Sequence, residues 1–200
     1  MGAARKGFAD AGGNPEELKL FINDYNLETA YDQNKKLESL IHWIEEWEKD
    51  GITKIDGIGS QMHVTCSMDP AKQKENEEAY VNMLNLMVGS QKLVRISELD
   101  MGLEVKKDGK DILVNTTDMT EEQHKAMRAY YEFIVKKYLE IVPKEQQWGI
   151  CQWCATDSPA NSGWRAGLPV GLWDLDYYRK HTYGGFAAGL GAPEYWNNAK

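Results

Sequence analysis

The feature that most constrains the fold of this 200-residue chain is a set of four short apolar runs. Each run is next to a stretch in which apolar residues recur at helical spacing. The runs cover residues 19–24, 54–61, 93–99 and 147–153. Such runs are typical of buried strands, and strands that alternate with helices predict parallel pairing through right-handed crossovers. The sequence therefore predicts an α/β protein with about four strand–helix units, in one domain that spans residues 1–200.

The expected helices are marked by their ends. Gly51 is suited to the left-handed cap that closes a helix, Asp69-Pro70 is a helix start, and Thr120 to Gln123 reads as a capping box. We expect a polar loop around residues 107–118 and a last helix interrupted by glycines. The predicted helices cover residues 29–50, 70–87, 120–142 and 177–190.

Composition excludes several classes of protein. The formal net charge of −8 argues against nucleic-acid binding, which needs a basic surface. The sequence contains no run of about 18 uncharged apolar residues, so no membrane span is expected. It also has no glycine-rich phosphate-binding loop, and we expect no cofactor.

The three cysteines, Cys66, Cys151 and Cys154, cannot all pair within one chain, and we expect free thiols. Cys151 and Cys154 form a C-x-x-C pattern that raises a redox or zinc alternative. Zinc needs four ligands, and no second Cys/His cluster has matching spacing, so we expect no metal. The simpler interpretation is that Cys151 belongs to a buried strand, where cysteine is a small apolar residue.

Polar residues gather where the predicted strands end. Glu98 and Asp100 are two residues apart on one strand, so both side chains point to the same side. His63 lies two residues after Gln61, at the end of the preceding strand, and neighbouring parallel strands lie about 5 Å apart. A histidine between two carboxylates could fix their orientation and protonation. The alternative is that Asp100 has already left the strand and caps a loop.

Three segments resemble, in order, signature strands of glycoside hydrolase family 10, the endo-β-1,4-xylanases. They are residues 20–28 (LFINDYNLE), 55–63 (IDGIGSQMH) and 94–100 (VRISELD). Trp153 with the segments 156–158 and 164–165 resembles the last strand of that family and its aromatic loop, and residues 171–174 resemble the segment before its final helix. The resemblance runs from about residue 3 to residue 190.

The resemblance implies a retaining glycosidase on a (β/α)8 TIM barrel that acts on xylan. Glu98 would be the nucleophile, with His63 and Asp100 orienting it. Sugar-contacting positions would be Tyr25, Asn26, Gln61, Trp153, Trp164 and Arg165, with the two tryptophans stacking on sugar rings. The family also implies a secreted, periplasmic or cell-surface protein, although no signal peptide is visible in this chain.

One departure stands out. The acid/base glutamate of the family lies in a Trp-x-x-x-Asn-Glu motif that this sequence lacks, and Asn76-Glu77 reads as the solvated start of a helix. The chain therefore resembles the second half of the barrel, and we expect the isolated chain to be inactive or nearly so. The expected partners are xylan or xylo-oligosaccharide, the missing N-terminal half of the barrel and, for the chain alone in solution, a second copy that pairs through exposed sheet edges. We also expect an apolar inner face. The alternative is a non-catalytic carbohydrate-binding or assembly fragment.

Overall fold

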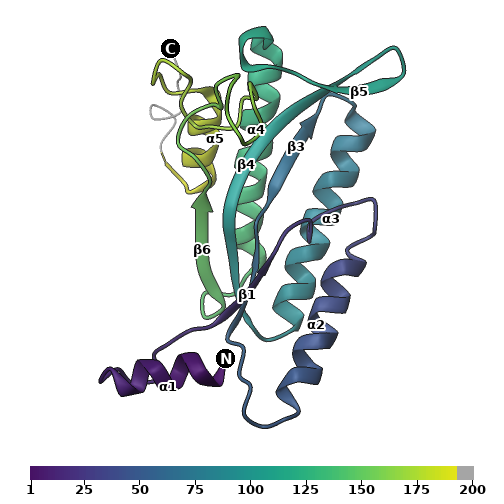
Figure 1. The fold of residues 1–200 in the computed structure, drawn as a ribbon. Coiled ribbons are helices and arrows are strands. Elements are labelled where there is room, and N and C mark those ends of the chain that lie inside the picture. Colours follow the sequence, from purple (N-terminus) through teal and green to yellow (C-terminus); the bar gives the residue numbers. More distant parts are fainter. Residues whose placement is uncertain (193–200) are drawn as a thin grey trace.

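The computed structural model describes residues 1–192 and has a six-stranded sheet at its centre, in which four parallel strands lie side by side (Figure 1). Their order in the sheet places β2 next to β1, β4 next to β2, and β6 next to β4. The sheet does not close, and β1 and β6 are its outer strands. The prediction of a parallel α/β arrangement is confirmed. The strands are β1 (Phe21–Asp24), β2 (Gly57–Ser60), β4 (Leu93–Lys107) and β6 (Gln147–Gln152).

The second predicted strand, residues 54–61, corresponds to β2, and a short strand that was not predicted follows it. Gln61 and Met62 separate β2 from β3 (His63–Ser67), and Met62 has a left-handed backbone with φ 64°. Both strands pair with β4, and the β3 register sets His63 opposite Asp100. His63 therefore lies beside the strand that carries the two candidate carboxylates.

The third strand is much longer than expected. β4 continues to Lys107 and turns into an antiparallel hairpin with β5 (Lys110–Leu113), so the predicted polar loop is wrong over these residues. Asp108 and Gly109 form the turn, with φ 51° and 76°. An Asp-Gly pair with two positive φ angles suits a primed hairpin turn, whose twist matches that of the strands.

Helices α2, α3 and α4 cover one face of the sheet (Figure 1). Asp69 caps α3 and Thr120 with Gln123 forms the capping box of α4, as predicted. The helix expected from residue 29 starts later, because Gln33 and Asn34 adopt left-handed backbones. The last helix is likewise shorter than expected. The helices are α1 (Gly2–Asp10), α2 (Lys35–Glu48), α3 (Pro70–Gly89), α4 (Glu121–Ile141) and α5 (His181–Gly189), with a 3₁₀ turn at Thr116–Asp118.

The core lies between the sheet and these helices. Ile58, Val94 and Ile96 point from the strands toward the helices and have almost no exposed surface. Tyr80 of α3 and Tyr138 of α4 meet them, and both hydroxyls donate to backbone carbonyls. Among the described helices, none has both the length and the apolar character needed to span a bilayer.

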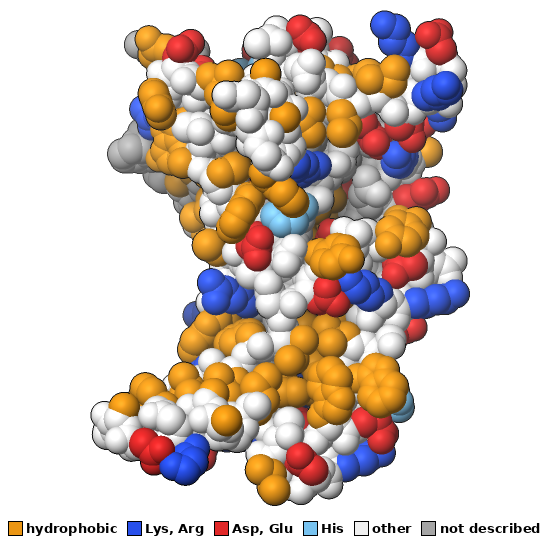
Figure 2. Space-filling model, in the orientation of Figure 1, with side chains coloured by type: hydrophobic (Ala, Val, Ile, Leu, Met, Phe, Trp, Pro, Cys, Tyr) orange, Lys and Arg blue, Asp and Glu red, His pale blue; other side chains and the backbone are white. Residues whose placement is uncertain are grey.

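The opposite face of the sheet is not the apolar surface expected. Gly59 of β2 lies between Asn23 of β1 and Arg95 of β4 in the strand register, and Ser97 follows on β4. Hydrophobic side chains on this side gather near the loops at the top and beside α1 at the bottom, with charged groups between them (Figure 2). Polar side chains and glycines thus occupy the middle of the inner face.

Candidate functional site

His63 lies between the two candidate carboxylates. Its Nε2 is 3.4 Å from Glu98 Oε2, and its Nδ1 is 3.2 Å from Asp100 Oδ1. The Nδ1 contact has the distance of an ion pair without the geometry of a hydrogen bond. The imidazole is therefore in contact with both carboxylates, and the three side chains form one cluster.

Asp100 belongs to strand β4 and does not cap a loop. Its side chain has no exposed surface, whereas that of Glu98 is 24% exposed. A buried carboxylate needs charged or hydrogen-bonding partners, and an exposed one can meet a ligand. The two carboxylates therefore differ in what they can do: Asp100 is held inside the protein, and Glu98 is partly exposed to solvent.

The loop after β6 supplies the partners of Asp100. Trp164 Nε1 donates to Oδ2 at 2.8 Å, and Arg165 Nη1 donates to Oδ1 at 2.5 Å. The family resemblance implies sugar contacts for Trp164 and Arg165, and their contact with Asp100 is not predicted by the sequence. No local spacing could reveal it, because more than 60 residues separate them in the chain.

Two tryptophan rings border His63. The Trp164 ring centroid lies 4.5 Å from that of the imidazole at a tilt of 58°, and the Trp153 centroid lies 6.2 Å away, edge to face. Each tryptophan remains about two-fifths exposed, at 41% and 43%. Exposed indole faces next to a carboxylate can stack on the apolar face of a sugar ring.

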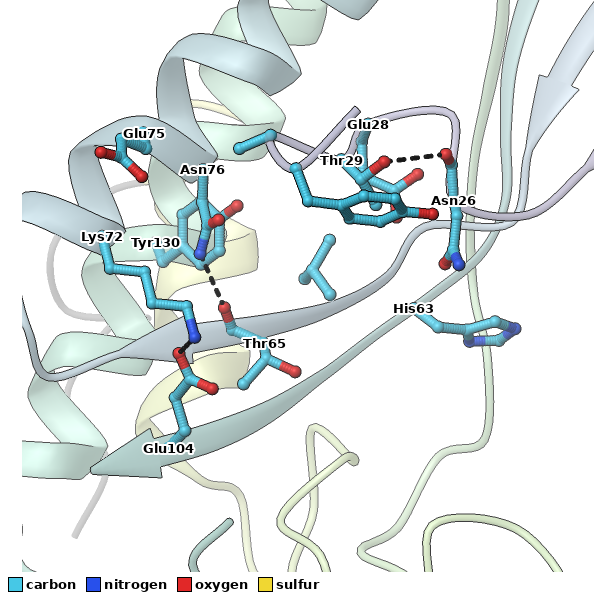
Figure 3. Close-up of a pocket in the computed structure, with 13 residues that line it drawn as sticks. Asn26, Glu28, Thr29, His63, Thr65, Lys72, Glu75, Asn76, Glu104 and Tyr130 are labelled. Atoms are coloured by element: carbon cyan, nitrogen blue, oxygen red, sulfur yellow. Dashed lines mark hydrogen bonds and ion pairs between the residues drawn. The ribbon is translucent and has the colours of Figure 1, made fainter. Parts of the chain in front are cut away.

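The remaining predicted site residues lie at the ends of the neighbouring strands. Tyr25 is exposed after β1, and the Lys36 ammonium lies 3.7 Å above its ring. Gln61 connects the strands through its backbone: its N–H donates to Asp24, and its carbonyl accepts from the N–H of Glu98. Asn26 has a left-handed backbone and lies near His63 in the close-up (Figure 3).

A cavity of about 420 Å³ lies beside His63. It is bounded by the loop after β1, by β3 and by the start of α3, and its lining includes Asn26, Glu28 and Asn76 (Figure 3). Lys72 and Glu104 form an ion pair at the end away from His63, with 2.6 Å between Nζ and Oε1. Amide, carboxyl and hydroxyl groups around such a space can hydrogen-bond a polar, uncharged ligand.

Glu28 is a second buried carboxyl that the sequence prediction left without a role. Burial raises its pKa, against the opposing effect of hydrogen bonds that include the one from Ser60 Oγ to Oε2 at 3.0 Å. The sequence did contain a signal for its importance, because Glu28 ends the segment 20–28 that resembles the family. Its burial depends on packing that a motif does not show.

A buried ion pair anchors the loop that carries the tryptophans. Lys180 Nζ lies 2.5 Å from Asp157 Oδ1 and donates to the carbonyls of Pro169 and Gly171. Thr116 also donates to Asp157. Burial lowers the pKa of Lys180, although Asp157 opposes this effect. The buried ion pair between Asp157 and Lys180 therefore holds the conformation of this loop.

The cysteines lie apart from this arrangement. Cys66 is buried, and burial raises the pKa of its thiol to about 12. Cys151 lies on β6 but is exposed, so its expected burial is wrong: its side of this outer strand is not packed against the helices. Among residues 1–192, no three His, Cys, Asp or Glu side chains are grouped to hold a metal ion.

Comparison with known proteins finds xylanases. An endo-beta-1,4-xylanase, Xyn10C, of Cellvibrio japonicus is 30% identical over 194 residues, which cover 86% of this chain and 28% of that protein. An endo-1,4-beta-xylanase B of Humicola insolens is 26% identical over 179 residues, covering 88% of this chain and 45% of that protein. The chain thus spans less than half the length of these relatives.

Solved structures agree on the fold. Xylanase10C of Cellvibrio japonicus, in complex with xylopentaose, matches with a TM-score of 0.66 and 27% identity, over 95% of this chain and 37% of that one. The endo-1,4-beta-xylanase XylE of Penicillium canescens matches with a TM-score of 0.69 and 21% identity, over 95% of this chain and 51% of that one. The open sheet therefore corresponds to part of their barrel. Residues 4–188 match glycosyl hydrolase family 10, and the chain belongs to that family.

Proposed function

We propose that this chain carries the nucleophile half of a retaining endo-β-1,4-xylanase site. The observation that carries the proposal is the position of His63 between Glu98 and Asp100, at 3.4 and 3.2 Å. Glu98 has the most exposed side chain of this group and is the nucleophile. His63 and Asp100 orient it.

In the first step, a carboxylate oxygen of Glu98 forms a bond to the anomeric carbon of xylose. The bond from that carbon to the glycosidic oxygen breaks, and the departing oxygen takes a proton from a general acid. Water then hydrolyses the glycosyl ester. Because no carboxyl of this sequence stands in a Trp-x-x-x-Asn-Glu motif, we assign the proton donor to the first half of the barrel, which would meet the outer strands β1 and β6.

The surroundings of Glu98 support a carbohydrate substrate. Trp153 and Trp164 offer exposed ring faces, and the polar cavity beside His63 offers hydrogen-bonding groups. Tyr25, Asn26 and Gln61 lie at the adjoining strand ends, in place to contact the same sugar chain. A polysaccharide is too large to cross a membrane, so we infer that the protein acts outside the cytoplasm.

A fluorosugar with a good leaving group tests this proposal without the first half of the barrel. We expect 2,4-dinitrophenyl 2-deoxy-2-fluoro-β-xylobioside to label the 200-residue chain, because dinitrophenolate departs without a proton and the fluorine slows hydrolysis of the ester. Mass spectrometry should place one fluoroxylobiosyl group on Glu98, and Glu98→Gln should remain unlabelled. Label on another carboxyl, or no label, would contradict the assignment and favour a non-catalytic carbohydrate-binding role.

A further inference from the structure

Asp100 is held by two neighbouring residues of the loop after β6. Arg165 Nη1 donates to one carboxylate oxygen at 2.5 Å, and Trp164 Nε1 donates to the other at 2.8 Å. The carboxylate is wholly buried, and removing one partner from such a group is costly. The position of Asp100, and through it that of His63, therefore depends on this loop.

The rest of the Arg165 guanidinium is bound to strand β3. Nη1 and Nη2 donate to the carbonyl of Val64 at 3.0 and 3.1 Å, and Nη2 donates to Thr65 Oγ1 at 3.0 Å. Val64 directly follows His63. One planar side chain thus ties the strand that carries His63 to the strand that carries Asp100.

The local backbone is shaped around this contact. Arg165 itself has a left-handed backbone, with φ 44°, which a residue with a side chain rarely adopts. Gly102 of β4 leaves the space that the guanidinium needs, because a Cβ there would lie 2.8 Å from Nη2. The side chain is only 15% exposed, and its contacts leave little of it for a ligand.

We propose that Arg165 is a positioning residue, which acts on Glu98 through Asp100 and His63 and does not bind the sugar. By fixing Asp100 and β3 together, it sets the orientation in which His63 Nε2 faces Glu98. This inference rests on the proposed function, since it concerns how well the nucleophile is placed. It replaces the sugar contact that the family resemblance implies for Arg165.

The rate of labelling by the fluoroxylobioside measures this placement. We expect Arg165→Ala to slow labelling at saturating reagent at least about tenfold, because a small misplacement of a reacting group costs that much or more. The reversible dissociation constant of the reagent should stay within about twofold, since no sugar contact is lost. Guanidinium ion, at concentrations far below denaturing, should restore part of the rate. A weakened dissociation constant with an unchanged rate would overturn the inference.

Arg5 provides a matched control. Its guanidinium pairs with Asp56 at 2.5 Å and donates to the carbonyls of Pro15 and Leu18. Asp56 directly precedes β2, so this cluster lies at the opposite end of the strands from Glu98. Arg5→Ala should lose comparable contacts and keep the labelling rate. If the effects of the two variants are equal, Arg165 is merely structural and the inference fails.

Trp164→Phe is a second variant, in case Arg165→Ala does not fold. It keeps an aromatic ring for the sugar and removes the N–H that donates to Asp100, so labelling at saturating reagent should also slow while the dissociation constant of the reagent stays unchanged. An unchanged rate would overturn the inference. If the unsubstituted chain is not labelled at all, the proposed function fails and takes the inference with it. If the unsubstituted chain and Arg165→Ala are labelled equally fast, only the inference fails.

Discussion

Ser97 Oγ donates a hydrogen bond to Asn23 Oδ1 over 2.7 Å, and the bond spans the strand that lies between them. That strand contributes Gly59, where a Cβ would lie 2.4 Å from Asn23 Oδ1. The glycine therefore makes room for a polar contact on the inner face of the sheet. This contact explains why a residue without a side chain occurs in the middle of a buried strand.

Gly59→Ala should push the Asn23 amide away and break its bond to Ser97. Since the displaced atom ends a flexible side chain, the expected cost is that of one hydrogen bond, about 1 kcal/mol in free energy of unfolding. Urea unfolding measures it. In an Asn23→Ala background the same change should cost almost nothing, because the two effects act through one contact. If the losses in free energy of unfolding of the two single variants add up in the double variant, Gly59 is needed for the backbone conformation and not for this hydrogen bond.

Glu28 should make stability fall as the pH rises. Burial raises its pKa in the folded state above the unfolded value, so between these two values the folded chain holds the proton and the unfolded chain releases it. The free energy of unfolding therefore decreases with pH across that window. Glu28→Gln mimics the protonated form, and its stability relative to the unsubstituted chain should increase from pH 4 to pH 8 in urea unfolding.

Glu16 gives a control of opposite sign. A hydrogen bond from Lys54 lowers its pKa, so ionisation of Glu16 favours the folded chain. The stability of Glu16→Gln relative to the unsubstituted chain should fall over the acid part of the same titration. If the difference in free energy of unfolding between Glu28→Gln and the unsubstituted chain does not change with pH, Glu28 is ionised and hydrated in the folded chain.

The parallel arrangement near His63 was predictable from sequence because it depends on local pattern. Alternation of apolar runs and helices implied parallel strands, and two-residue spacing put Glu98 and Asp100 on one side of a strand. The hairpin after β4 was also predictable, since Asp108-Gly109 is a strong turn signal that the polar composition of the segment concealed.

The contacts of the loop after β6 could not be predicted in the same way. Arg165 meets Val64, 101 residues away in the chain, and Lys180 meets Asp157 inside the loop itself. Neither pair has a fixed spacing in any helix or strand. The apolar inner face was expected because barrels are filled by branched side chains, whereas here Asn23 and Ser97 replace them with a hydrogen bond.

Trp153→Ala should weaken binding of xylopentaose by about 3- to 10-fold, the amount expected for one lost stacking contact. Isothermal titration calorimetry measures the dissociation constant. Trp43 of α2 is also exposed, at 51%, but lies on a helix away from His63, so Trp43→Ala should bind normally. Equal losses in the two variants would point to nonspecific binding by exposed tryptophans.

Asp157→Asn should be among the most destabilising single changes in the chain. It leaves the Lys180 ammonium, whose side chain is 4% exposed, without its carboxylate. An unpaired buried charge costs about 3–5 kcal/mol, which thermal and urea unfolding would both detect. The Gly171 N–H and the Thr116 hydroxyl would also lose their charged acceptor.

Removing both charges distinguishes the effect of the ion pair on the loop from the cost of leaving one buried charge unpaired. Asp157→Leu with Lys180→Met keeps apolar volume and leaves no charge unpaired, so it should be less destabilising than Asp157→Asn. If the loop depends on the ion pair for its conformation, the double variant should nevertheless bind xylopentaose more weakly, because Trp153 and Trp164 lie on either side of Asp157. Normal binding by a stable double variant would show that packing alone orders the loop.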